Sequence, residues 1–178
     1  MAKTTFQGPV VSKAGFFNTG PGNVVDADSS VSLTVDTHAG RIVHNDAAGA
    51  VTYTLPATNA NSDSAIAGPG ADLNNLSNVG ARFEIFNSIT KTGDLVVQVA
   101  NATDVMIGSA SFIDDSSDKM VGFETASTSD TITLNGSTTG GVTFAKIECT
   151  VIASGKWQVE VVSGCTGTPA TPFSAAVS

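Results

Sequence analysis

The feature that most constrains the fold is a strict alternation of apolar and polar side chains within residues 144–162. The alternation continues on both sides of a small Ala-Ser-Gly turn. A period of two is the pattern of a β-strand that buries one face, because successive side chains point to opposite sides of a sheet. We therefore predict a β-hairpin. The apolar positions of its two strands are Ile147, Cys149, Val151, Trp157, Val159 and Val161.

The length of the turn decides whether the two apolar sets share a face. A two-residue loop would place Val151 opposite the polar Gln158 and would mix the two kinds of side chain. A three-residue loop, 153–155, instead places Val151 opposite Trp157. We predict the longer loop, with its glycine in the left-handed conformation on which such loops end.

Cys149 and Cys165 are the only cysteines of the chain. Two cysteines are too few for a disulfide framework or a four-ligand zinc site. In the predicted hairpin they lie about six residues apart along the ladder, roughly 20 Å, which is beyond the reach of a disulfide. We expect two separate thiols, buried or half-buried.

Short strand patterns recur upstream, separated by turn clusters rich in Gly, Ala, Asn and Thr. With the hairpin they make about nine or ten strands, and no helix is predicted. This regular alternation of short strands and turns indicates an all-β fold, a jelly-roll-like sandwich or barrel of short antiparallel strands. The upstream strands are expected at 31–35, 41–44, 51–55, 82–86, 94–99, 121–124 and 131–134, with a further short strand or turn at 105–108.

A chain of 178 residues has the usual size of one domain. We place the β domain at residues 29–163. Three segments depart from the strand rhythm: an extended N-terminal arm at 1–28, a long surface loop at 57–80, and a C-terminal tail at 164–178. Phenylalanines in unpatterned ends need a surface to cover them, either on a neighbouring subunit or on the chain's own core.

The charge is low in density and uneven. Only 13% of the residues are charged, and eight basic against sixteen acidic residues give a formal net charge of -8. An acidic body is a poor partner for nucleic acid, which proteins bind by neutralising phosphates. Residues 1–25 contain Lys3 and Lys13 and no acid, so this segment carries +2 while the remainder carries -10.

No apolar run approaches the ~20 residues that span a bilayer. At the N-terminus, Gly8 and Pro9 interrupt the apolar residues before a signal-peptide core forms. We therefore expect no membrane partner, and a protein that is made and kept in a cytoplasm or released by lysis.

Residues with metal-binding potential are sparse. His38 and His44 flank a predicted turn, but no third ligand of matching spacing accompanies them. Asp114 and Asp118 are the first and fifth positions of a calcium-like loop, whose sixth and twelfth positions are a Lys and a Thr instead of the Gly and Glu that such loops use. We expect solvated turn acids, and a weak calcium site at Asp114 and Asp118 stays open as the alternative.

Catalytic signatures are also missing. We find no serine nucleophile elbow and no glycine-rich phosphate loop between a strand and a helix. Tyr53 and Trp157 are the sole Tyr and Trp, too few for the stacking surface that sugar-binding clefts need. We therefore expect no enzyme, no catalytic residue and no cofactor.

Several short segments resemble small β-rich proteins that are encoded beside the major capsid protein in tailed phages. The likeness spans most of the chain, although residues 57–80 look longer than the corresponding connection. The segments that carry it are Phe6-Gln7-Gly8-Pro9-Val10, Gly15-Phe16, Thr54-Leu55-Pro56, 81–87, 104–108, 130–136, Gly140-Gly141, 155–159 and Pro172-Phe173-Ser174.

The resemblance implies a capsid decoration, or cement, protein. Such a protein is commonly a homotrimer that binds the major capsid protein on the outer surface of an assembled head and clamps neighbouring subunits without covalent bonds. The alternatives are another virion structural protein, such as a head fibre base or tail component, and a carbohydrate-binding or adhesion module. The capsid or subunit interface is expected at Phe6, Lys13, Phe16, Phe17, Pro172 and Phe173.

Overall fold

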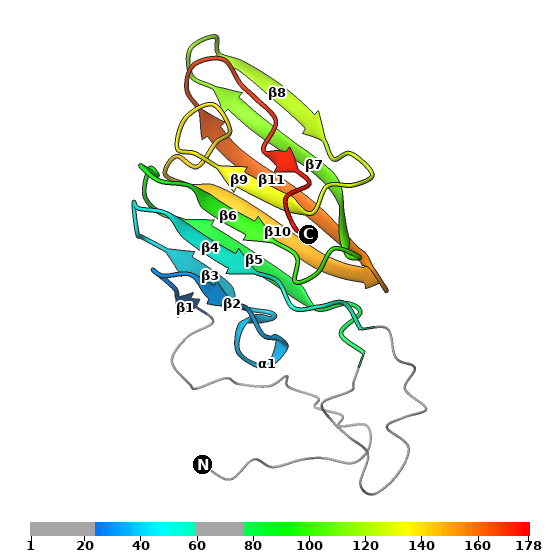
Figure 1. Ribbon diagram of the computed structural model, residues 1–178. Coiled ribbons are helices and arrows are strands. Elements are labelled where there is room, and N and C mark those ends of the chain that lie inside the picture. Colours follow the sequence, from blue (N-terminus) through cyan, green and yellow to red (C-terminus); the bar gives the residue numbers. More distant parts are fainter. Residues whose placement is uncertain (1–23, 60–76) are drawn as a thin grey trace, which may run out of the picture.

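The structure, a computed structural model, describes residues 24–59 and 77–178 as two stacked sheets around a shared core (Figure 1). The larger sheet, sheet A, extends from β1 at one edge to β8 at the other. Its strands in spatial order are β1 (Val24–Asp26), β3 (Ile42–Asn45), β5 (Arg82–Asn87), β10 (Ala145–Ala153), β11 (Lys156–Cys165), β7 (Val105–Asp114) and β8 (Lys119–Glu124).

The smaller sheet, sheet B, lies in front of sheet A in Figure 1. One short helix, α1 (Val35–His38), follows its edge strand. The strands of sheet B in spatial order are β12 (Phe173–Ser174), β9 (Thr131–Leu134), β6 (Leu95–Gln98), β4 (Val51–Thr54) and β2 (Val31–Ser32). The predicted all-β, sandwich-like fold is therefore confirmed.

The β10–β11 hairpin has the predicted register. Val151 pairs with Trp157 and Cys149 with Val159. Gly155 has a φ of 71°, the left-handed conformation expected at the end of a three-residue loop.

The prediction of an antiparallel fold is wrong, because both sheets are mixed. Five of the ten strand pairs in the described residues are parallel: β1 with β3, β3 with β5, β2 with β4, β4 with β6, and β11 with β7. Parallel neighbours come from chain segments that no tight turn joins, so a local sequence pattern does not reveal them.

Two predicted strands also differ in extent. β7 is ten residues long, whereas the sequence indicated a short strand at 105–108. Its middle consists of small residues, Gly108-Ser109-Ala110-Ser111, which show little contrast between apolar and polar faces. The predicted strand at 31–35 ends after Ser32, and α1 follows; the backbone N–H of Thr34 donates to Nδ1 of His38 at 3.0 Å.

One hydrophobic core lies between the sheets. Trp157 and Phe83 on sheet A are fully buried with ring centroids 5.7 Å apart, and Tyr53 and Leu95 on sheet B are equally buried. Both cysteines are buried free thiols, as predicted, and burial raises the pKa of Cys149 to about 12.

The two ends of the predicted domain fold more than the sequence indicated. The last residues of the predicted arm form β1, and Ala27 joins the core. At the other end, β12 of the predicted tail pairs with β9, and Phe173 faces the core. Of the predicted loop 57–80, residues 60–76 lie outside the described residues.

Candidate interaction surfaces

An exposed apolar patch occupies one end of the outer face of sheet A. Ile113 on β7 pairs with Met120 on β8, and both point away from the core. On the other side of Ile113, its β11 partner is Gly164, whose missing side chain leaves room for the ring of Phe144. Val162, two residues before Gly164, borders this row. The exposed fractions of Phe144, Ile113, Met120 and Val162 are 47%, 48%, 73% and 39%.

Phe144 holds its ring in this patch with a strained backbone. Its φ is 76°, in the left-handed region that bulky L-residues seldom adopt. A Cβ on Gly164 would lie 3.1 Å from the tip of the Phe144 ring, so the ring lies directly over that glycine. Strain of this kind persists only when the surroundings enforce it, and it concentrates at functional sites.

A lattice of ion pairs crosses the middle of the same face. Glu84 and Glu148 lie directly opposite each other on β5 and β10, and Glu160 on β11 continues the row. Like charges placed opposite each other repel. Arg82 offsets part of this repulsion, with Nη2 at 2.5 Å from Oε2 of Glu148 and 3.5 Å from Oε2 of Glu84. Nζ of Lys146 lies 3.5 Å from Glu148 and 3.8 Å from Glu84.

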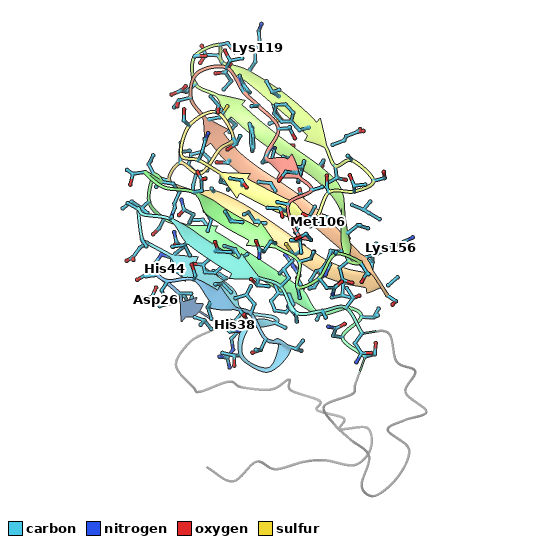
Figure 2. The ribbon with its side chains drawn as sticks, in the orientation of Figure 1. Asp26, His38, His44, Met106, Lys119 and Lys156 are labelled. Atoms are coloured by element: carbon cyan, nitrogen blue, oxygen red, sulfur yellow. The ribbon has the colours of Figure 1, made fainter. Side chains whose placement is uncertain are left out.

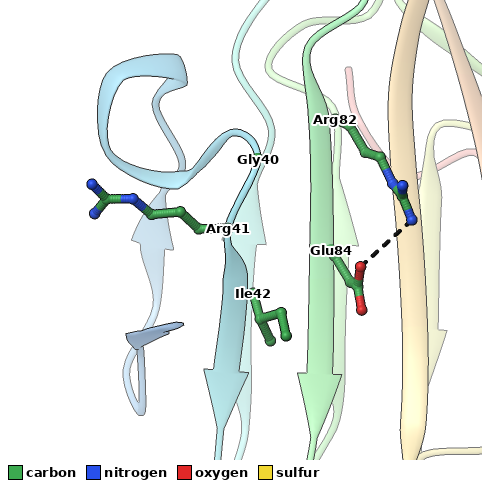
Figure 3. Close-up of a pocket in the computed structure, with 5 residues that line it drawn as sticks. All are labelled: Gly40, Arg41, Ile42, Arg82 and Glu84. Atoms are coloured by element: carbon green, nitrogen blue, oxygen red, sulfur yellow. Dashed lines mark ion pairs between the residues drawn. The ribbon is translucent and has the colours of Figure 1, made fainter. Parts of the chain in front are cut away.

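A shallow hollow of about 260 Å³ lies beside this lattice, between β3 and β5. Figure 3 shows Arg82 turned toward Glu84, while Arg41 points away on the other side of Ile42. The polar groups of the hollow are thus engaged with each other or directed outward. This arrangement extends the ion-paired surface to the gap between β3 and β5.

Three polar residues form a hydrogen-bonded chain at the β1 edge. Nδ1 of His44 lies 2.9 Å from Oδ1 of Asp26, and its Nε2 lies 2.8 Å from Oγ of Ser88. The order is that of a serine hydrolase triad, in which the acid is buried. The Asp26 side chain is instead 68% exposed. We interpret the chain as a cross-strand link that ties β1 to β3 and to the end of β5; Figure 2 shows Asp26 and His44 together at this edge.

The predicted metal-binding candidates do not assemble into a site. In residues 24–59 and 77–178, no group of three or more His, Cys, Asp or Glu side chains is placed to hold a metal ion. His38 is buried and its Nδ1 accepts from Thr34. Asp114 organises the β7–β8 turn: its carboxylate accepts from N–H and Oγ of Ser116 and from Oγ of Ser117. These hydrogen bonds lower the pKa of Asp114.

The outer face of sheet B carries no charge. None of its five described strands contains an acidic or basic residue. The outward side chains are half-buried or exposed and mostly bear hydroxyl or amide groups: Ser32, Thr52, Thr54, Val96, Gln98, Thr133 and Ser174. This face offers hydrogen bonds to water and only one apolar side chain.

The structure separates the predicted interface residues into two groups. Phe6, Lys13, Phe16 and Phe17 lie outside the described residues. Pro172 and Phe173 are buried, and the carbonyl of Pro172 accepts from the N–H of Thr133 at 2.8 Å. Of the two surfaces that the sequence left open for Phe173, the structure has the chain's own core: the predicted tail contributes a strand to sheet B.

A buried carboxylate explains why the tail folds back. Oδ1 of Asp130 accepts from the backbone N–H groups of Ala176 and Val177 at 2.8 and 3.2 Å, and from Oγ1 of Thr131 at 2.7 Å. The side chain of Val177 packs partly against the core. Sequence reasoning missed Asp130, since an Asp before a strand is also typical of an ordinary turn.

The patch was missed for a related reason. Alternation predicts which strand face is buried, but it does not distinguish an exposed Ile or Met from a core residue. Nor does any local signal predict the left-handed backbone of Phe144, since glycine is the residue expected there.

Comparison with known proteins adds no relative, because no protein family, curated protein or solved structure matches the chain. The described residues contain no helix that is long and apolar enough to cross a membrane.

Proposed function

We propose that this protein is a decoration protein of a phage head, which binds the outer surface of the assembled capsid as a homotrimer and clamps neighbouring capsid subunits by non-covalent contacts. The observation that carries the proposal is a contrast within the chain. The described body is a β unit of two sheets around one core, while residues 1–23 hold three Phe, two Lys and no acid.

The first residues of the chain suit contact with another protein. They join the body at the edge strand β1, which the Asp26 and His44 side chains secure. An extended segment can lay aromatic side chains on a neighbour or add a strand to it. In a trimer three such weak contacts act together, and avidity multiplies their affinity.

The chemistry of the body supports a structural role. Its buried carboxylates serve its own backbone, since Asp130 holds the C-terminal residues and Asp104 accepts from N–H and Oγ1 of Thr58 at 2.9 and 2.8 Å. Groups engaged in this way brace loops and are not available to a substrate.

The proposal can be tested by removing residues 1–20 and measuring co-sedimentation with heads that lack the protein. We expect the shortened chain to keep its thermal transition and to lose head binding. A matched control, Val35→Ser on exposed α1, should bind as the intact chain does. Undiminished binding by the shortened chain would reject the assignment of the contact to this segment.

Antibody labelling of particles separates this function from other virion roles. A decoration protein covers the head in many copies, whereas a fibre base or tail component gives a few labels at fixed points. Labels confined to the tail would contradict the proposal.

A further inference from the structure

The patch formed by Phe144, Ile113, Met120 and Val162 has the composition of a docking surface. Aromatic residues and Met are enriched in the cores of protein interfaces, where charges are depleted. The four residues come from three adjoining strands and from the segment before β10. We propose that this patch binds Phe16 and Phe17 of a neighbouring copy of the chain.

The strained backbone of Phe144 indicates that its ring contacts another molecule. A glycine would adopt the same φ of 76° without a steric penalty. The Phe144 side chain is 47% exposed, so its burial returns only part of the stabilisation that a core phenylalanine gives. When another surface covers the exposed ring, the burial of its apolar area offsets the energetic cost of the strained backbone.

Charge favours one occupant. Three acids border the patch, Glu160 on β11 and the exposed Asp115 and Asp118 of the β7–β8 turn, against two bases, Lys119 beside Met120 and Lys146 opposite Val162. The border is therefore acidic by one charge. A second body, which also carries excess negative charge, would be repelled. Residues 1–25 are the segment with net positive charge, and Lys13 precedes Phe16 and Phe17 by three and four positions. The same segment thus brings a cation to the acids and two aromatic rings to the patch.

Reach assigns the contact to a neighbouring copy. The seven residues from Phe17 to Val24 span at most about 24 Å. Val24 shares a cross-strand row with Ser109 on β7, five strand spacings away, and Ile113 lies four residues further along. At ~4.8 Å per strand and ~3.3 Å per residue, Ile113 is about 27 Å and Met120 about 32 Å from Val24.

Val162 shares a row with Asp26, four strand spacings from β1, and lies only about 20 Å from Val24. The backbone of a chain's own Phe17 can therefore reach the near border of the patch but not Ile113 or Met120. Covering the whole patch takes the segment of a neighbouring copy.

The contact is head-to-tail, since it joins two different surfaces. Such contacts form a ring when the rotation between copies closes, and a filament when it does not. Closure after three copies would give the trimer of the proposed function. The contact itself does not require a capsid, so it stands or fails in the purified protein independently of head binding.

The test is a disulfide between two separately purified full-length variants. Asn18→Cys sits beside Phe17 and leaves both rings intact. Gly122→Cys sits beside Met120, where an added Cβ meets only the carbonyl oxygen of Ala110 at 3.9 Å. Cys149 and Cys165 are buried and do not compete. When the two variants are mixed under mild oxidation, we expect a disulfide-linked heterodimer.

The matched control pairs Asn18→Cys with Val35→Cys, whose native side chain is 40% exposed at a distant site. Heterodimer should form about tenfold faster with Gly122→Cys than with this control, and adding Phe144→Gly to the Gly122→Cys chain should remove the difference. Since glycine relieves the strained φ, we expect that variant to stay folded, as its thermal transition will show.

Three results would overturn the proposal. Equal rates for Gly122→Cys and Val35→Cys would mean that the patch does not bind this segment. Gly122→Cys homodimers in place of heterodimers would show that two patches pair with each other. A monomeric disulfide in a chain that carries both cysteines, at high dilution, would assign the contact to the chain's own segment.

Discussion

The outer faces of the two sheets differ in chemistry, although the sheets share one interior. Sheet A presents cross-strand rows of ionised side chains and, at one end, the exposed apolar patch around Phe144 and Met120. Sheet B presents hydroxyl and amide groups without a single charge on its strands. Both faces nevertheless cover one core, to which each sheet contributes fully buried side chains such as Trp157 and Tyr53.

The difference shows how a chain with few charges uses them. Hydroxyl groups keep sheet B hydrated without ion pairs, and its half-buried valine is too small for an anchor. On sheet A the acids and bases surround an apolar patch, and an interface of this kind is apolar at its centre and polar at its rim. We therefore propose sheet A, and not sheet B, as the face that contacts other subunits.

The largest loss of stability is expected for a substitution in the core that the two sheets share. Trp157→Ala removes a fully buried indole that packs on Phe83, and should lower the free energy of unfolding by about 3–5 kcal/mol. Trp157→Phe should cost less, because a ring remains and the buried indole N–H, which has no partner among the described residues, is removed. Urea denaturation measures both. Separate transitions for the two sheets would contradict a shared core.

A smaller effect is expected at the edge of sheet B. Asp130→Ala leaves the N–H groups of Ala176 and Val177 without their acceptor and should destabilise the protein by about 1–3 kcal/mol. Hydrogen exchange at these two amides should become faster, while exchange in β10 of sheet A stays unchanged. Unchanged exchange at Ala176 and Val177 would show that Asp130 does not hold the tail.

Acid should weaken the hairpin that flanks the patch. Hydrogen bonds from Ser116 and Ser117 lower the pKa of Asp114 below its ordinary value of 3.8. A carboxyl with a lowered folded pKa stabilises the protein above that ordinary value, and the contribution disappears as pH falls through the folded pKa. Asp114→Asn should therefore be less stable than the parent near pH 7, and the two should converge as pH falls below 3.8 and through the lowered folded pKa of Asp114. A constant difference in denaturation midpoint across this range would refute the assignment.

The smallest change in stability is expected for a substitution in the ion-pair lattice of sheet A. Glu148→Gln removes a half-exposed charge that Arg82 and Lys146 contact, but it also removes repulsion from Glu84 and Glu160. The net change should be about 1 kcal/mol or less, and it should shrink as salt is added. A large, salt-independent loss of stability would mean that the lattice is a buried network and not a surface one.

Sequence patterns predicted the local part of this architecture. The alternation on both sides of Gly155 specified the β10–β11 register, because only one loop length brings the two apolar sets onto one face. Parallel neighbours such as β11 and β7 were not predicted, since their pairing depends on the path of the whole chain.

The candidate site was predicted less well than the fold. Phe173 looked like a loose aromatic in an unpatterned tail, but the Asp130 carboxylate fastens the residues after it, and the ring completes the core. Phe144 looked like the start of a strand, but its backbone is left-handed and its ring is exposed. Both outcomes depend on contacts between distant segments. The part played by Phe6, Lys13, Phe16 and Phe17 stays a prediction.

Oxidation of methionine offers the most direct test of contact through sheet A. Met120 is 73% exposed and Met106 is fully buried, so the second provides an internal reference in the same chain. Peroxide converts an accessible thioether to the sulfoxide, which mass spectrometry locates. At equal protein concentration, Met120 should oxidise several-fold more slowly in the intact chain than in a Phe16→Ser, Phe17→Ser variant, with Met106 slow in both. Equal oxidation rates of Met120 in the two chains would contradict the contact of Phe16 and Phe17 with the patch.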